Sequence, residues 1–173
     1  MEAKPATGVG TSASPPLDAA FWRIERTSFI GREDQIRDLS IYLEDGARLV
    51  TIFGAPGLGK TRLLRRLGGL LAEEGASVWF CDLTAASDAG DVLAVVTRTL
   101  GIPMVLGGTE LDADVQLGHA LAARGRVALL LDNLERVVAH AGALVSRWLV
   151  MAPSALFIAS SRETLGLEEE VCF

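Results

Sequence analysis

Residues 54–61 read GAPGLGKT and match the spacing G-x-x-x-x-G-K-[ST]. Glycines at these positions let backbone N–H groups converge on an anion without interference from a Cβ atom. The lysine of such a loop neutralises phosphate charge, and the hydroxyl group that follows it is a suitable ligand for Mg²⁺. We therefore expect this segment to bind the phosphate groups of a nucleotide. Its candidate binding residues are Gly54, Gly57, Leu58, Gly59, Lys60, Thr61 and Arg62, of which Lys60 is also a catalytic candidate.

A carboxylate that could share the metal ion follows much later in the chain. Asp132 comes directly after an uninterrupted apolar run at residues 127–131, which is typical of a strand buried on both faces of a parallel sheet. Such a strand delivers its last side chain to the carboxyl edge of the sheet, where the phosphate loop would also lie. We expect Asp132 and Thr61 to hold Mg²⁺ together. The simpler alternative makes Asp132 a turn residue or a helix cap.

Hydrolysis of a nucleotide also needs a group that orients the attacking water. Glu135 could do this through its charge and Asn133 through hydrogen bonding, although Glu135 could equally be a solvated acid in the first turn of a helix. Arg162 follows an apolar run at residues 155–159, so it should reach the same sheet edge and pair with γ-phosphate oxygens. Considered alone, an arginine in this position is more often a plain surface residue.

Alternating strand and helix patterns surround these candidates and predict an α/β fold of βαβ units with right-handed crossovers. Residues 1–20 contain Pro, Gly, Ser and Ala without an apolar period and are expected to form a flexible tail ahead of one domain at residues 21–173. Short apolar segments indicate strands at 48–53, 77–82, 126–131 and 155–159. Helical periodicity appears at 33–44, 60–74, 91–100, 112–123 and 139–151, with a loop at 101–109.

Charge and hydropathy exclude several classes of partner. Sixteen basic and 22 acidic residues give a net charge of −6, the wrong sign for a domain that clamps nucleic acid through its phosphates. Arg62, Arg65 and Arg66 cluster at helical spacing, but beside a phosphate loop such a group is more often a solvated face. No uncharged apolar run approaches the roughly 20 residues of a membrane span. The N-terminus has no signal-peptide pattern, which favours the cytoplasm.

Four ordered segments resemble the STAND class of signal-transducing P-loop ATPases, in particular its bacterial transcription-regulator branch, which is related to NB-ARC domains. They are FIGRE at 29–33, GAPGLGKTR, ALLLDNLE and IASSRETLGL. The resemblance covers about residues 27–173. It implies a three-layer P-loop NTPase of the ASCE type with a parallel sheet of about five strands in the order 5-1-4-3-2. It also implies that Arg162 is a sensor arginine, that Asp132 is the Mg²⁺ carboxylate, and that Ile30, Gly31 and Arg32 lie near adenine and ribose.

The resemblance further implies an ATP/ADP-dependent regulatory switch that uses Mg²⁺. Many relatives carry a second acid directly after the metal-binding aspartate, where this chain has Asn133, so we expect slow hydrolysis or a binding switch. Adenine is expected because no N-K-x-D sequence, which reads guanine, occurs in the chain. Helical and winged-helix subdomains follow the core in such proteins, so we expect a truncated C-terminus and a protein partner or those missing subdomains. A small-molecule phosphotransferase and a non-catalytic interaction module stay open as alternatives.

Overall fold

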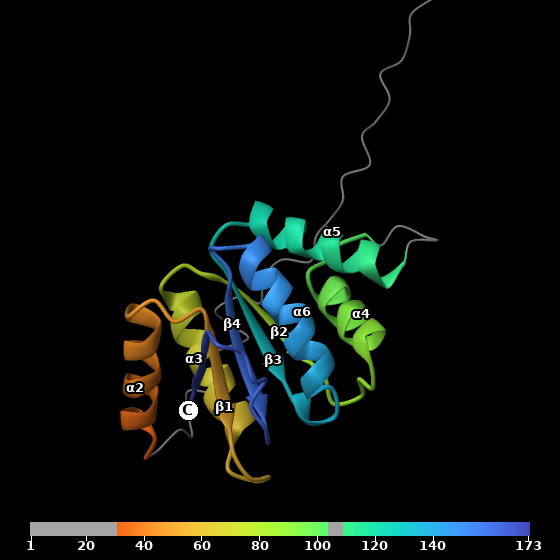
Figure 1. The fold of residues 1–173 in the computed structure, drawn as a ribbon. Coiled ribbons are helices and arrows are strands. Elements are labelled where there is room, and N and C mark those ends of the chain that lie inside the picture. The colour runs from red at the N-terminus through yellow and green to blue at the C-terminus, as the bar shows by residue number, and fades with distance from the viewer. Residues whose placement is uncertain (1–30, 104–108) are drawn as a thin grey trace, which may run out of the picture.

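The computed structural model describes residues 31–103 and 109–173 (Figure 1). Its centre is a parallel five-stranded sheet in the order β2-β3-β4-β1-β5, which is the expected order 5-1-4-3-2 counted from the other edge. The strands are β1 (Leu49–Phe53), β2 (Ser77–Asp82), β3 (Val127–Asp132), β4 (Leu156–Ser161) and β5 (Glu170–Cys172). The expected fold class is therefore confirmed.

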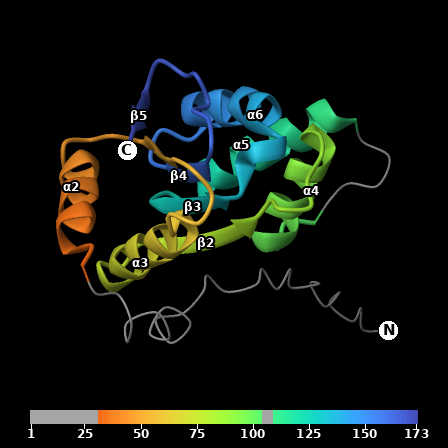
Figure 2. The ribbon, with the colours of Figure 1, turned by 90° about the horizontal axis from the view of Figure 1, so that it is seen from below.

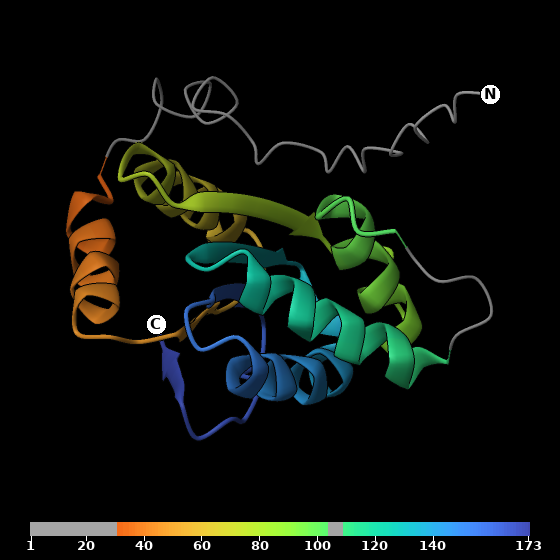
Figure 3. The same cartoon turned by 90° about the horizontal axis from the view of Figure 1, so that it is seen from above.

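Helices cover both faces of this sheet, as Figure 2 and Figure 3 show from below and from above. Helices α2 (Glu33–Glu44) and α3 (Lys60–Glu73) lie on one face. Helices α4 (Ala89–Thr99), α5 (Glu110–Ala123) and α6 (Val138–Met151) lie on the other. A short 3₁₀ turn, η2 (Leu134–Arg136), follows β3. The arrangement has three layers, as expected.

Two apolar clusters hold the layers together, because alternate residues of a strand face opposite sides of the sheet. In β1, Leu49 packs in the cluster with α4, α5 and α6, whereas Val50 and Ile52 pack against the leucines of α2 and α3. All six residues of β3 are buried, since β2 and β4 flank it and helices cover both of its faces. This explains the uninterrupted apolar run that precedes Asp132.

The observed boundaries differ from the expected ones where polar side chains act locally. Helices α4 and α5 each begin two residues earlier than expected, because Asp88 and Thr109 accept the N–H groups of Asp91 and Asp112 and so cap the first turns. Strand β4 continues beyond the apolar run through two buried serines that pair with β1. The expected tail and Ile30 lie outside the described residues. Within residues 31–103 and 109–173, no helix combines the length and the hydropathy that crossing a membrane requires.

Candidate functional site

The phosphate loop, defined as residues 54–59, joins the end of β1 to the first residue of α3. Its φ angles are 81° at Gly57 and 77° at Gly59, in the left-handed region that residues with a Cβ atom rarely adopt. Gly59 is also the N-cap residue of α3, so the loop leads directly into the positive end of the helix dipole. Free backbone N–H groups at this end favour an anion.

Lys60 is mostly buried against the loop that precedes it. Its Nζ atom donates hydrogen bonds to the carbonyl oxygens of Gly54, over 2.8 Å, and Ala55, over 3.3 Å. Only 11% of the side chain is exposed. The ammonium group is thus held against the first residues of the loop, where its positive charge adds to the partial positive charge of the helix N-terminus.

Thr61 and Asp132, 71 positions apart in the chain, meet at the carboxyl edge of the sheet. The Thr61 hydroxyl donates a hydrogen bond of 3.0 Å to Asp132 Oδ1. Asp132 is the last residue of β3 and is 1% exposed. A hydroxyl and a carboxylate are the hard oxygen ligands that Mg²⁺ prefers, and this ion typically completes its shell with water and phosphate oxygens. The two residues therefore fit the metal expected from the sequence.

Ser160, which precedes Arg162 in the sequence and received no expected role, supports Asp132 from β4. Its hydroxyl donates a hydrogen bond to Asp132 Oδ1 and accepts the backbone N–H of Asn133 over 3.1 Å. Burial raises the pKa of the Asp132 carboxyl, and the hydroxyl bonds from Ser160 and Thr61 oppose this rise. The only sequence signal for this contact was the pair of serines that directly follows the apolar run at residues 155–159.

Asn133 binds neighbouring side chains in the described structure. Its backbone lies in the left-handed region, with φ of 63°, which asparagine tolerates better than most residues. Its amide donates to Thr84 Oγ1 over 2.9 Å and to Asp132 Oδ2 over 3.3 Å. Thr84 in turn donates its hydroxyl and its N–H to Asp82, which lowers the pKa of the Asp82 carboxyl. The amide of Asn133 is therefore engaged in joining the ends of β2 and β3.

Glu135 faces two cations, which argues against the alternative that it is a solvated acid. Its Oε1 atom lies 3.7 Å from Lys60 Nζ and 3.9 Å from Arg162 Nε. The Glu135 side chain is 22% exposed and that of Arg162 is 59% exposed. Arg162 directly follows β4, and its Nε atom faces Glu135 at the sheet edge where β1 and the phosphate loop also meet.

Arg32 is the member of the expected adenine and ribose set that touches the phosphate loop. Its guanidinium donates to the carbonyl oxygen of Leu58, and a Cβ atom at Gly59 would lie 3.5 Å from Arg32 Nη2. Gly31 lies beside it and donates its N–H to Glu33 over 3.1 Å. Arg62 is exposed in the first turn of α3. The structure thus brings Arg32 to the loop, while Ile30 lies outside the described residues.

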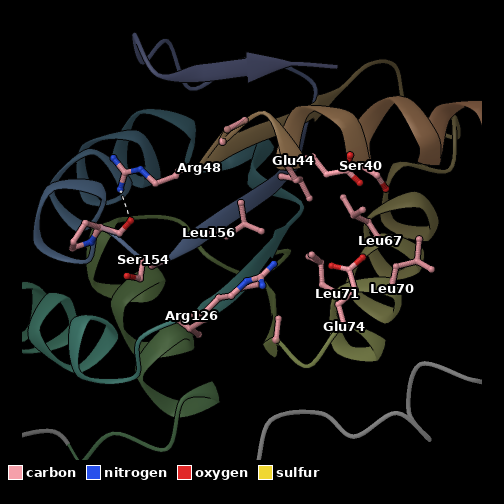
Figure 4. A pocket seen from close by; sticks show the side chains of 18 residues that line it. Ser40, Glu44, Arg48, Leu67, Leu70, Leu71, Glu74, Arg126, Ser154 and Leu156 are labelled. Carbon is pink, nitrogen blue, oxygen red and sulfur yellow. Dashed lines mark hydrogen bonds between the residues drawn. The ribbon is translucent and has the colours of Figure 1, made fainter.

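A separate pocket of about 490 Å³ opens at the other edge of the sheet, where the strands begin (Figure 4). Leucines of α3 form part of its wall, and the charged residues around it are Glu44, Arg48, Glu74 and Arg126. Arg48 is tied down there by hydrogen bonds to the carbonyl oxygens of Leu149 and Pro153. None of these residues belongs to the phosphate loop or to its partners, so this pocket is distinct from the candidate site.

Curated relatives of the chain come from mycobacteria. An uncharacterized protein of Mycobacterium tuberculosis is 32% identical over 146 residues, which are 84% of this chain and 36% of that protein. A second M. tuberculosis protein, named for a proposed role as an HTH-type transcriptional regulator, is 33% identical over 124 residues, which are 72% of this chain and 14% of that protein. The chain therefore spans about a third or less of the length of these relatives.

Solved structures share the fold at low sequence identity. Cdc6p from Pyrobaculum aerophilum superposes with a TM-score of 0.64 at 19% identity, over 87% of this chain and 48% of that one. A STAND protein with a tetratricopeptide repeat sensor from Pyrococcus horikoshii gives a TM-score of 0.53 at 18% identity, over 83% of this chain and 22% of that one.

The sequence pattern of the AAA domain family matches residues 43–157, a stretch that contains the phosphate loop and Asp132. The match covers more than half of the chain, and the fold and the site geometry agree with it. The chain therefore belongs to the AAA domain family and forms an AAA-type P-loop ATPase domain.

Proposed function

We propose that this chain is the nucleotide-binding core of an ATP/ADP-dependent regulatory switch that hydrolyses ATP slowly with Mg²⁺. One observation carries the proposal. Lys60, Thr61 and Asp132 meet at the N-terminus of α3, where the Thr61 hydroxyl lies 3.0 Å from Asp132 Oδ1. A cation, a hydroxyl and a carboxylate in this arrangement suit a polyphosphate and its metal ion. Mg²⁺, when bound, would neutralise part of the negative charge of the phosphate groups.

The remaining residues take the roles expected from the sequence. The loop amides and Lys60 would bind the phosphates, and Arg162 would respond to the presence of the γ-phosphate. Glu135 is the better candidate for orienting water, because the amide of Asn133 is already bonded to Thr84 and Asp132. The absence of an acid directly after Asp132 supports slow hydrolysis.

The contact of Arg32 with Leu58 supports a nucleotide subsite beside the loop that includes Arg32 and its neighbour Gly31. That these residues and Ile30 lie near adenine and ribose is proposed from the sequence resemblance alone. We propose ATP and ADP as its ligands, on the sequence grounds given above.

A role in regulation is supported by the relative named for HTH-type transcriptional regulation and by the fold shared with a STAND protein. Because this chain spans only part of its relatives, we propose that a partner protein or further subdomains read the state of the nucleotide. The net charge of −6 supports the proposal that this segment does not itself bind DNA and that any contacts with DNA are made by other segments or by a partner. The cytoplasm is the proposed location.

Isothermal calorimetry of the wild-type chain with Mg²⁺ and ATP, ADP or GTP tests the proposal. We expect adenine nucleotides to bind, and Lys60→Ala to weaken them tenfold or more because a mostly buried cation beside the phosphates is lost. Arg66→Ala is the matched control, since it removes one positive charge from the same helix. Equal titrations for wild type and Lys60→Ala would contradict the proposal. Turnover that requires an added acceptor would instead support a phosphotransferase.

A further inference from the structure

Glu135 lies between two positive groups that come from distant parts of the chain. Lys60 begins α3, Arg162 follows β4, and Glu135 lies in the 3₁₀ turn after β3. A single carboxylate oxygen of Glu135, Oε1, takes part in both ion pairs, at 3.7 Å from Lys60 Nζ and 3.9 Å from Arg162 Nε. In the proposed function these are the two side chains that bind and report phosphate groups.

Both contacts are ion pairs longer than a direct hydrogen bond. Charge-assisted N–H···O bonds measure about 2.7–2.9 Å, shorter than either distance here. Lys60 gives its hydrogen bonds to the loop carbonyls of Gly54 and Ala55 instead. The carboxylate is therefore attracted to both cations by charge, without the geometry that would fix it firmly. A stronger anion could take its place at little cost in hydrogen bonding.

We propose that Glu135 is an internal counter-ion that the γ-phosphate displaces, and that it thereby sets how strongly the site distinguishes nucleoside triphosphate from diphosphate. The inference rests on the proposed function, because it assigns Lys60 and Arg162 to the phosphates. A terminal phosphate carries close to two negative charges and accepts several charge-assisted hydrogen bonds, so it outcompetes one carboxylate. A diphosphate lacks the group that draws Arg162 away, and the pair between Arg162 and Glu135 then persists.

A counter-ion and a water-orienting group predict different changes in triphosphate affinity when the charge of Glu135 is removed. If the carboxylate competes with the γ-phosphate, removal of its charge tightens the binding of triphosphate. If Glu135 only orients water, removal of its charge slows hydrolysis and leaves affinity unchanged. Binding measured with a non-hydrolysable triphosphate separates the two effects.

The test uses the whole chain with Glu135→Gln, which removes the charge and keeps the shape of the side chain. Calorimetry with Mg²⁺ and the β,γ-imido analogue of ATP is expected to show that the variant binds the analogue more tightly than the wild type does, with a Kd lower by about fivefold. The Kd for ADP is expected to change by less than about twofold. Glu163→Gln is the matched control: it removes the same charge from the exposed residue next to Arg162 and is expected to leave both values unchanged. Circular dichroism checks that each variant is folded.

An unchanged or higher Kd for the analogue in Glu135→Gln overturns the inference, and so does equal tightening in Glu163→Gln. In either case binding by the wild type would leave the proposed function standing. Wild-type protein that binds no nucleotide would overturn the proposed function and the inference together. A double-mutant cycle of Glu135→Gln and Arg162→Gln in nucleotide-free protein gives a second readout. Non-additive changes in unfolding free energy support the ion pair, and additive changes contradict it.

Discussion

The hydroxyl of Thr61 donates a 3.0 Å hydrogen bond to the carboxylate of Asp132 and so joins the first turn of α3 to the end of β3. The bond connects two segments that only the parallel arrangement of the sheet brings together. β3 is separated from β1 by β4, and all three strands end at the same edge. The phosphate loop and the carboxylate that we propose as a Mg²⁺ ligand therefore lie side by side as a result of the fold, which would reduce the ordering cost of binding.

Asp132→Asn is expected to stabilise the nucleotide-free protein at neutral pH. Burial raises the pKa of this carboxyl above its ordinary value of 3.8, so the folded state carries a cost when the group is charged. Between pH 3.8 and the folded pKa the folded state retains a proton that the unfolded state has lost, and this relative stabilisation disappears as pH rises through the folded pKa. The asparagine variant avoids the cost of the charge.

Thermal unfolding between pH 4 and pH 8 measures this effect. The melting temperature of Asp132→Asn should exceed that of the wild type by a few degrees at pH 8, and the difference should shrink toward pH 4. A difference that stays constant across the range would show that the charge of Asp132 is not the cause.

Gly57→Ala and Gly75→Ala form a pair that separates strain from nucleotide binding. Both glycines have positive φ, 81° and 87°, and a Cβ atom at either position would meet nothing within 4 Å. Each substitution should therefore cost about 1–2 kcal/mol of stability through backbone strain alone. Gly57 lies in the phosphate loop, whereas Gly75 lies in the turn after α3, at the far end of that helix.

We expect denaturant unfolding to show similar losses for the two variants. Calorimetry should show about tenfold weaker Mg²⁺-nucleotide binding for Gly57→Ala only, because relief of the strain moves the loop amides that bind phosphate. Equal affinities in the two variants would mean that the loop amides do not bind the nucleotide.

Features that follow from the order of elements could be predicted from the sequence. The apolar run before Asp132 indicated a buried parallel strand, and the rule that such strands deliver their last residues to one edge placed this carboxylate near Thr61. The phosphate loop was evident because its glycines, lysine and hydroxyl occur at fixed spacing. These inferences needed only local patterns and the topology of βαβ units.

Contacts that depend on the register between strands could not be predicted in the same way. The pairing of Ser160 with Asp132 requires β4 to extend beyond its apolar residues, and the sequence predicted an earlier end. The bridge from Asn133 to Thr84 depends on one left-handed residue after β3. Packing between helices was equally hidden from the sequence: Asp114 of α5 is buried and accepts hydrogen bonds from Arg147 and, over 2.7 Å, from Trp148, both in α6.

Ser160→Ala should lower stability and shift the pH dependence of nucleotide binding, because its hydroxyl holds two groups at once. Removal of the oxygen deprives Asp132 of a donated hydrogen bond and leaves the N–H of Asn133 without its acceptor, which together should cost about 1–3 kcal/mol. The lost bond to the carboxylate also raises the pKa of Asp132 further. In the proposed site Mg²⁺ would bind only the deprotonated carboxylate, so the affinity for Mg²⁺-ADP should then rise toward its plateau at a higher pH than in the wild type.

Ser161→Ala is the matched control for this variant. Ser161 is equally buried in β4 and accepts the N–H of Glu163 over 3.2 Å, and within the described part of the chain it makes no hydrogen bond to Asp132. Calorimetry of Mg²⁺-ADP across a pH series that extends from neutral toward acid should place the midpoint of Ser161→Ala with that of the wild type and the midpoint of Ser160→Ala above both. Coincident midpoints for all three proteins would mean that Ser160 does not tune the carboxylate. Its contact with Asp132 would then serve only to hold β3 against β4.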